Sequence, residues 1–353
     1  ELQVAVPLTQ VQQTLARYVR ARTGLRVAVQ PAAAIQGPLA GLLPDAPVVF
    51  SDTHTIYLPG EIGCFPSQWE NRALYVALAK LEAGLLEFGT HDFDFEKALD
   101  LCVGHDLCVG FKGVPPWDAG GKVTEKGADL ERFFNLFPDS AKAAGLFTIF
   151  EHGRVRCRLA LQYPGLVRKV LPLYRVESRR MWAAGEGDPV LLPLYHTIAL
   201  GAAEPLPLGA HADTALLLKI QDCFENEMNH RKIDGHKMSG RDVPETCAPL
   251  TAMAYNMLFE ALKADGAKGE AIKPAGSMAL FPFGRHLRPD LVHNSFAAYD
   301  DLSRKIIKAL KKNGVKAYKA DVRRRLVANN GCLSPEELQE IIFNEGGDED
   351  GPD

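Results

Sequence analysis

Three potential metal ligands stand at a regular spacing in the run Cys102-x-x-His105-x-x-Cys108. Thiolate and imidazole groups three residues apart lie on one side of a helix or within one loop, and together they could bind zinc. Structural zinc takes four ligands, usually as two separated pairs, and the sequence has no second pair at a suitable spacing, although His91 or Cys64 could fold near. We therefore expect buried thiols beside an ordinary histidine rather than a metal centre.

Glu82 could also act with His54, His91 and His105 as a metal-dependent hydrolytic centre. Such a centre often places two histidines and a general base on one helix as His-Glu-x-x-His, and the chain has no such motif. It also lacks a Gly-x-Ser-x-Gly nucleophile elbow, a dinucleotide-binding glycine motif and a complete phosphate-binding loop. We therefore expect no catalytic residue and no cofactor, and we keep a metal-dependent hydrolase as the alternative function.

The composition indicates a folded protein whose overall charge does not direct it to nucleic acid or membrane. Of 353 residues, 46% are hydrophobic and 24% are charged, and the formal net charge is −4. No segment approaches the roughly 18 uninterrupted apolar residues of a membrane span. Seven scattered cysteines suggest reduced thiols and a cytoplasmic protein. The start, Glu1-Leu2-Gln3, has neither an initiator Met nor a signal-peptide pattern, so we expect a trimmed chain.

The element that must position Glu82 is a helix expected from Ser67 to Phe88. Ser67 followed by Glu70 forms a capping box, in which side chains satisfy backbone amides of the first turn, and Gly89 suits the position after the last turn. Apolar residues recur at spacings of three and four, which predicts one face packed on a core: Leu74, Leu78, Leu81, Leu85 and Phe88.

Two polar residues, Asn71 and Glu82, interrupt that apolar face. At about 100° per residue they lie within roughly 20° of each other around the helix, but about 16 Å apart along its axis, too far to pair. Buried polar groups need partners. We expect both residues to be structural, with Glu82 accepting from an arginine or a backbone amide of a later helix.

Helical patterns dominate the rest of the chain. Residues 25–30 alternate like a strand that could join a hairpin expected at 48–59. Stretches rich in Gly and Pro at 31–47 and 110–121 are expected to be loops, and 271–296 an irregular packed segment. Helices are expected at 8–23, 95–110, 129–137, 139–162, 166–182, 189–200, 213–229, 250–264, 300–312, 318–328 and from 335.

These patterns predict a mainly α, multi-helix domain with a small antiparallel β-sheet near the N-terminus. The domain is expected to cover residues 1–344, with a candidate sub-boundary in the polar loop 230–249. The acidic, Gly-rich run 345–353 is expected to be a disordered linker. Basic residues concentrate between Lys305 and Arg325, and without a recognition motif we interpret them as solvated helix faces rather than a nucleic-acid site.

Two stretches, from Thr55 to Thr90 and from Leu146 to Leu166, resemble one protein family. They are similar to the region before the von Willebrand factor A (VWA) domain in bacterial proteins that act with MoxR-type AAA+ ATPases. The nitric-oxide-reductase and Rubisco activation proteins belong to this family. The similar residues are Thr55-Ile56-Tyr57-Leu58-Pro59, Asn71, Leu74-Tyr75, Glu82-Ala83-Gly84, Glu87-Phe88-Gly89-Thr90, Leu146-Phe147-Thr148-Ile149-Phe150-Glu151, Arg154 and Tyr163-Pro164-Gly165-Leu166.

The resemblance implies an adaptor or scaffold whose partners are a MoxR-type AAA+ ATPase and the target enzyme that it remodels or activates. The family's VWA domain would follow Asp353, after the acidic linker. The Asp-x-Ser-x-Ser metal signature of that domain is missing here, because Asp301-Leu302-Ser303 is followed by Arg304-Lys305. Arg154-Val155-Arg156 also departs from the family by being more basic.

Binding of such a partner should use exposed surfaces. One candidate is Trp117, because an exposed aromatic side chain in a loop rich in Gly and Pro offers a large contact area at low entropic cost. The same side chain could instead fold back onto the core. The other candidate is the basic outer side of the helix expected at 166–182, with Arg168, Arg175 and Arg179.

Overall fold

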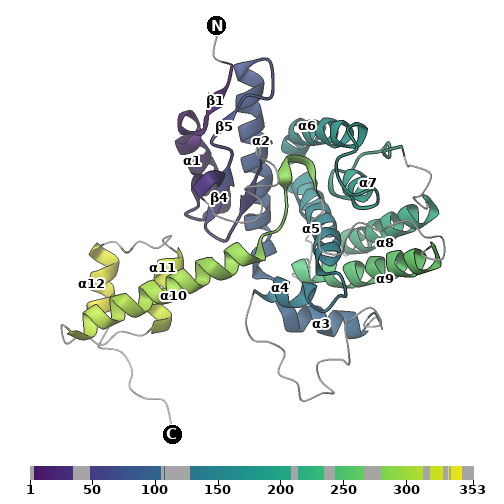
Figure 1. The fold of residues 1–353 in the computed structure, drawn as a ribbon. Coiled ribbons are helices and arrows are strands. Elements are labelled where there is room, and N and C mark those ends of the chain that lie inside the picture. Colours follow the sequence, from purple (N-terminus) through teal and green to yellow (C-terminus); the bar gives the residue numbers. More distant parts are fainter. Residues whose placement is uncertain are drawn as a thin grey trace.

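The helix that carries Glu82 runs through the middle of the fold in the computed structural model of the protein (Figure 1). This helix, α2 (Gln68–Glu87), begins after Ser67, whose hydroxyl accepts from the Glu70 amide and donates to the Glu70 carboxylate. Just beyond its end, Gly89 has a left-handed backbone with a φ of 68°. The predicted capping box and terminal glycine are confirmed, and the apolar residues of the predicted face are all buried.

The structure describes residues 4–34, 48–104, 107, 128–207, 214–233, 243–265, 280–312, 319–328, 333 and 335–343. Within these residues the fold is mainly α with small sheets near the N-terminus, as predicted. No helix in this described part combines the length and the apolar character needed to cross a membrane.

Two small sheets pair strands of the N-terminal region. In the first, β1 (Val6–Pro7) lies antiparallel to β5 (Glu61–Ile62). In the second, β4 (Thr55–Leu58) lies between β3 (Phe50–Ser51), which is antiparallel to it, and β2 (Ala28–Pro31), which is parallel to it. The strand predicted after residue 25 therefore joins the predicted hairpin, and this second sheet is mixed.

The helix α1 (Gln12–Thr23) packs along α2, and Arg22 ties the two helices together. The Arg22 guanidinium donates to the Glu87 carboxylate and to the Lys80 carbonyl, both at 2.7 Å. Gly24, with a φ of 73°, ends α1 directly after the helix expected at 8–23. The N-terminal helix and strands thus lie on one side of α2.

The helical part that follows is built around α5 (Ser140–Gln162), whose middle turns are almost wholly buried. Asp139 caps α5 by accepting from the Lys142 amide. The other helices of this part are α3 (Phe95–Gly104), α4 (Asp129–Phe134), α6 (Pro164–Ala183), α7 (Leu191–Leu194), α8 (Thr214–Ile233) and α9 (Cys247–Asp265), with a π-helix at Tyr195–Ala199. Short 3₁₀ turns lie at Leu8–Gln10, Ala32–Ala34, Thr90–Asp92, Pro244–Thr246 and Pro282–Gly284.

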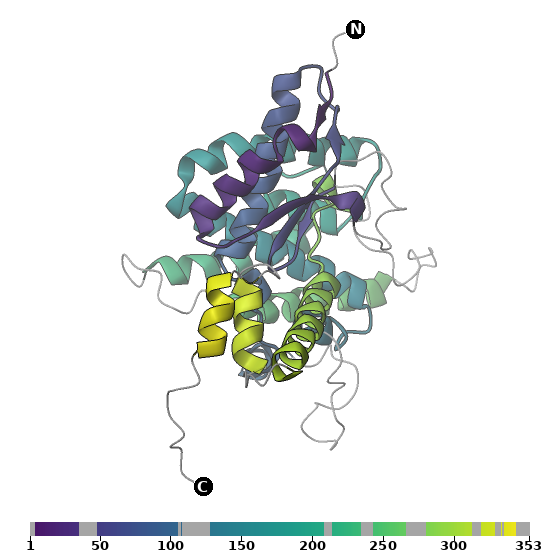
Figure 2. The ribbon, with the colours of Figure 1, turned by 90° about the vertical axis from the view of Figure 1, so that its left-hand side faces the viewer.

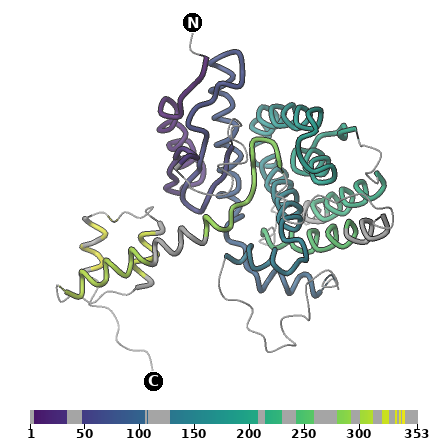
Figure 3. The backbone as a smooth tube through the Cα atoms, in the orientation of Figure 1, coloured from purple at the N-terminus to yellow at the C-terminus, as the bar shows by residue number. Residues whose placement is uncertain are grey.

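Residues 280–288, which we call the strap, enter this core before α10 (Pro289–Lys312) leaves it. Figure 3 shows the strap rising between α2 and α5. The sequence predicted irregular structure through residue 296, and this was wrong for 289–296, which are helical. Proline at the first helical position and Asp290 in the first turn both favour a helix start at Pro289.

The helices α10, α11 (Lys319–Ala328) and α12 (Pro335–Phe343) form a C-terminal arm that projects from the rest of the molecule (Figures 1 and 2). The arm has an apolar cluster of its own, formed by Leu310, Val322, Leu326 and Ile341. The predicted extent of the domain, 1–344, and its sub-boundary at 230–249 stay predictions. Residues 234–242 of that loop and the predicted linker 345–353 lie outside the described residues.

Candidate functional site

Glu82 is buried in a polar cluster where α2, β3 and the strap meet. Its side chain accepts at Oε1 from Nε of Arg285 at 2.8 Å, and the two residues are 2% and 4% exposed. Ser51 donates from Oγ to Oε2 of Glu82 at 2.8 Å, and Nε2 of His91 lies 3.4 Å from the same hydroxyl. Glu82 therefore has an arginine partner, as the sequence predicts, but this arginine lies in the strap and not in a helix.

Burial controls the ionisation of the groups around this pair. Burial opposes the charge of Arg285, but the charge and hydrogen bond of Glu82, together with Tyr195 and Tyr174, hold the pKa of Arg285 above its usual range. Burial raises the pKa of Tyr195 to about 12 and that of Tyr174 well above its usual value. Burial also lowers the pKa of His91 to about 4. At neutral pH Arg285 thus keeps its charge, whereas His91, Tyr174 and Tyr195 are uncharged.

A second buried ion pair lies within one turn of α5. Arg154 and Glu151 are both fully buried, and Arg154 donates from Nε and Nη2 to the two oxygens of Glu151 at 2.7 and 2.6 Å. Arg154 also donates to the Phe88 carbonyl at 2.9 Å, and Thr90 donates to Glu151 at 2.5 Å. Burial alone would raise the pKa of Glu151, but the Arg154 charge and these hydrogen bonds together lower it. The pair ties α5 to the end of α2.

Asn71, the other polar residue predicted on the buried face of α2, is also fully buried. Its side-chain oxygen accepts from the Phe65 amide at 2.9 Å. Its nitrogen donates to the carbonyls of Val4 and Phe65 at 3.1 and 3.0 Å. Because these contacts are with backbone groups, Asn71 fixes the chain before α2, which fits the structural role predicted for it.

The described residues do not assemble the metal sites considered from the sequence. His54 lies in the turn between β3 and β4, and His91 lies beside the Ser51 hydroxyl. In the part of the chain that the structure describes, no group of three or more His, Cys, Asp or Glu side chains could hold a metal ion. Cys102 is buried in α3. The other two metal-ligand candidates, His105 and Cys108, lie outside the described residues. So does Trp117, the candidate for partner binding.

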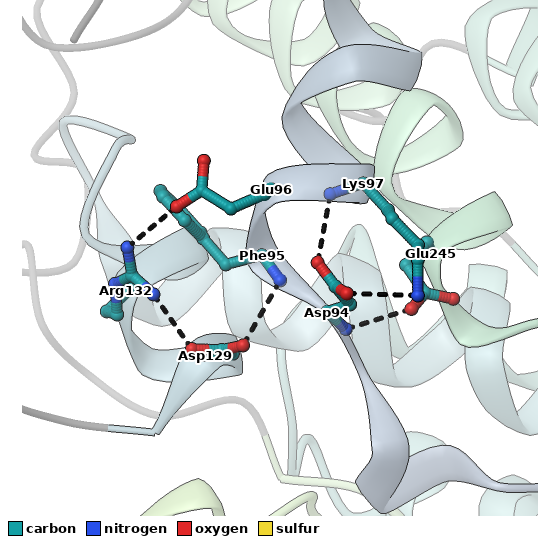
Figure 4. A network of polar contacts seen from close by, with 7 residues as sticks. All are labelled: Asp94, Phe95, Glu96, Lys97, Asp129, Arg132 and Glu245. Carbon is teal, nitrogen blue, oxygen red and sulfur yellow. Dashed lines mark hydrogen bonds and ion pairs between the residues drawn. The ribbon is translucent and has the colours of Figure 1, made fainter. Parts of the chain in front are cut away.

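A network of polar contacts anchors the start of α3 (Figure 4). The Asp94 carboxylate accepts from the Lys97 amide at 3.0 Å, which caps the helix, and the Asp94 amide donates to Glu245 at 2.9 Å. On the other side of the helix, Arg132 donates to Asp129 at 2.9 Å. The network joins α3 to α4 and to the turn before α9, so it positions helices.

Of the three arginines predicted to bind a partner, two are exposed on α6. Arg168 and Arg179 are exposed, and Arg179 pairs with Glu204 at 3.4 Å. Arg175 instead donates to the carbonyls of Leu200 and Gly201 at 2.7 to 3.0 Å. These carbonyls lie at the C-terminal end of the π-helix, where a positive charge is stabilising. Arg175 therefore serves this turn rather than the outer face on which the sequence analysis placed it. Partner binding by Arg168 and Arg179 stays a prediction.

Two exposed apolar side chains near this face were missed by the sequence analysis. Trp69 in the first turn of α2 is 76% exposed, and Val176 on α6 is 62% exposed. Burial raises the pKa of the Cys64 thiol, and the charge of Glu177 on α6 raises it further. The helices α2 and α6 contact each other. The position of Trp69, opposite the apolar face of α2, was the signal that could have identified it.

Comparisons with known proteins yield no relative for this arrangement. No protein-family model, no curated protein and no solved structure matches the chain.

Proposed function

We propose that this chain is a non-catalytic adaptor that acts with a MoxR-type AAA+ ATPase to remodel or activate a target enzyme. One observation carries the proposal: the two stretches that resemble proteins of this kind, 55–90 and 146–166, meet in one buried interface. They lie far apart in sequence, and the resemblance says nothing about their contact. A resemblance that covers one connected structural unit is stronger support than two isolated matches.

The interface is formed by α2 and α5, and residues that carry the resemblance lie on both sides of it. Gly84 allows the helices to approach closely, because a Cβ atom there would lie 3.0 Å from Cγ1 of Val155 and 3.3 Å from Cδ1 of Leu159. Polar contacts continue the interface between the resembling residues, from Arg154 to Phe88, from Thr90 to Glu151 and from Tyr163 to Glu87.

The outer face of α6 is the surface we assign to partner binding. Arg168, Lys169 and Arg179 are exposed on this helix, together with Val176. Cations around an exposed apolar side chain suit an acidic segment with an apolar anchor on the partner. Trp117 is kept as a second candidate. The described cysteines are free thiols, which supports a cytoplasmic location for the complex.

Capture of a MoxR-type ATPase from the same source by the immobilised full chain tests the proposal. We expect Arg168→Glu/Arg179→Glu to reduce capture at least tenfold, and Trp117→Ala to reduce it less. Lys308→Glu/Lys311→Glu is the matched control, because it makes the same change in charge on exposed positions of α10. Equal capture by all variants would contradict the assigned surface. Failure of the wild-type chain to capture any ATPase would contradict the adaptor function.

Metal analysis of the purified chain separates the adaptor from the alternative, a metal-dependent hydrolase that uses Glu82. The Glu82 carboxylate already accepts from Arg285 and Ser51, which supports a structural role. We expect no stoichiometric metal. One equivalent of zinc that is lost on Glu82→Ala would overturn the non-catalytic assignment.

A further inference from the structure

The strap fills a groove between two parts of the molecule. Its residues from Phe281 to Arg288 are all buried, yet its only regular structure is a short turn at Pro282–Gly284. In Figures 1 and 3 it runs between α2 on one side and α5 and α6 on the other. A buried irregular segment of this kind must be held by specific contacts, because it has few backbone hydrogen bonds of its own.

On one side of the groove, two helical segments contact the two aromatic side chains of the strap. Phe281 stacks on Tyr195 of the π-helix, with ring centroids 4.4 Å apart. Phe283 meets Tyr174 of α6 edge to face, with centroids 4.8 Å apart. Both are favoured arrangements of aromatic pairs. Phe281 and Phe283, which are two residues apart in the strap, therefore each have a separate aromatic partner.

On the other side, the groove binds the backbone and the charge of the strap. The Val49 amide donates to the Phe283 carbonyl at 3.0 Å. Arg285 pairs with Glu82 at 2.8 Å, and its guanidinium lies 5.7 Å from the centre of the Tyr174 ring. Backbone pairing combined with sites for alternate side chains is a common way in which proteins bind extended peptides. The strap is held as such a peptide would be.

The backbone of the strap has a conformation that depends on the groove. Phe283 has a φ of 58°, in the left-handed region that bulky side chains disfavour, and Gly284 follows with a φ of 59°. Residues remain in this region only where their surroundings enforce it. Departure from the groove would relieve this strain, which favours release of the strap.

The groove is lined by polar groups that water could hydrate once the strap had left. Ser51 and Glu82 face Arg285. The hydroxyl of Tyr174, whose ring contacts Phe283, is buried without a hydrogen-bond partner in the described part of the chain. Polar cavities hold water, whereas apolar ones stay empty. Separation of the ion pair would also return both charges to water, which offsets the loss of their attraction.

The strap leads directly into a unit with its own core. The arm helices pack around their own apolar cluster, so the arm can stay folded when the strap leaves the groove. Release of the strap would therefore remove Phe281, Phe283 and Leu287 from the main core and leave the cluster of the arm in place.

We infer that the groove is a peptide-binding site for segments with the pattern aromatic-x-aromatic-x-arginine, as in Phe281, Phe283 and Arg285. The chain fills this site with its own strap, and a segment of the same chemistry takes its place when the strap leaves. The site is distinct from the outer face of α6, so it does not depend on the proposed ATPase partner.

Binding of a labelled strap peptide tests this inference. The probe is the fluorescein-labelled peptide of residues 280–288, LFPFGRHLR. The protein is the full chain with Phe281→Ala, Phe283→Ala and Arg285→Ala. We expect this variant to bind the peptide at least tenfold more tightly than the wild type, whose groove is filled. Arg285→Glu in the peptide, or Glu82→Gln added to the variant, should each weaken binding at least tenfold. The inference would be overturned if the triple variant and the wild type bound the peptide equally well. It would also be overturned if neither Arg285→Glu in the peptide nor Glu82→Gln in the variant weakened binding.

Circular dichroism checks that the triple variant folds. Hydrogen exchange of the wild-type chain is a second test, and it does not depend on that variant. We expect the strap amides to exchange at least tenfold faster than the buried amides of α5 at 148–155, because the strap opens without global unfolding. Equal exchange in the two segments would show that the strap opens only with the whole fold, which would overturn the inference. A wild-type dimer that the peptide dissociates would support it, with the strap of a second copy as the occupant.

Discussion

The two buried glutamate–arginine pairs lie in one core but are built differently. Glu151 and Arg154 are three residues apart on α5, so their side chains face each other as soon as that helix forms. Glu82 and Arg285 are 203 residues apart, and they meet only when the strap is in its groove. The local pair therefore strengthens an interface between two helices, whereas the long-range pair depends on the position of the strap.

The difference between the pairs distinguishes two consequences of burying a charge, namely the loss of stability when a partner is removed and the coupling of the pair to the position of the strap. Loss of one member of either pair leaves an uncompensated charge in the core, which is costly in both places. Only the long-range pair can also be separated by movement of a segment, with both charges returned to water. Variants of the two pairs should thus resemble each other in stability and differ in the exposure of the strap.

The largest loss is expected from Arg154→Met, which leaves Glu151 without its cation and removes the bond to the Phe88 carbonyl. The free energy of unfolding should fall by about 3–5 kcal/mol in urea titrations. The double variant Glu151→Gln/Arg154→Met is the control, and it should recover part of this loss because no charge is left unpaired. A loss below about 1 kcal/mol in Arg154→Met would mean that the pair is hydrated in solution.

Glu82→Ala should lower the free energy of unfolding by about 2–4 kcal/mol, because Arg285 and Ser51 lose their acceptor. It should also raise the hydrogen exchange of the strap relative to α5, an effect not expected of Arg154→Met. An unchanged thermal melt would reject the burial of this pair. Equal exchange changes in the two variants would remove the distinction between local and long-range pairs.

His91, beside Ser51 in the Glu82 cluster, should make stability depend on pH. Its folded-state pKa of about 4 lies below the usual value of about 6.5, so the unfolded state binds the proton first as pH falls. Its contribution is full above about pH 6.5 and is lost toward pH 4, with a slope of at most about 1.4 kcal/mol per pH unit. Urea titrations between pH 7 and 4 should show a shallower decline for His91→Gln. Identical slopes for the two proteins would show that His91 ionises normally.

The smallest effect is expected from Ser67→Ala, which removes the cap of the helix that carries Glu82. The free energy of unfolding should fall by about 1 kcal/mol through loss of one capping bond. Strap exchange should stay at its wild-type level, because the ion pair lies several turns away. Chemical denaturation would show a neutral result if α2 began at a different residue.

Features that depend on local spacing could be predicted from the sequence. Ser67, Glu70 and Gly89 determine where α2 begins and ends, and its apolar spacing indicated a buried face that includes Glu82. The need of a buried carboxylate for a partner then predicted an arginine or a backbone amide. The sequence could not identify Arg285 as that partner, because the strap has neither helical nor strand periodicity and its Phe283 conformation is imposed by surrounding residues.

The pair formed by Glu151 and Arg154 had a local signal that was not used. Opposite charges three residues apart, directly after the largely apolar run 143–150, indicate a buried pair. The error on Arg175 has a different origin. Its place on the helix was predicted correctly, but the carbonyls of Leu200 and Gly201 that bind it come from a turn whose position cannot be deduced from helix periodicity.

The length of α10 gives the strap a mechanical role. A continuous helix of 24 residues is about 36 Å long, so a rotation of about 10° at Pro289 displaces its far end by roughly 6 Å. A force that turned the arm would therefore act on the strap, and on Arg285, over a much shorter distance than at the far end of α10.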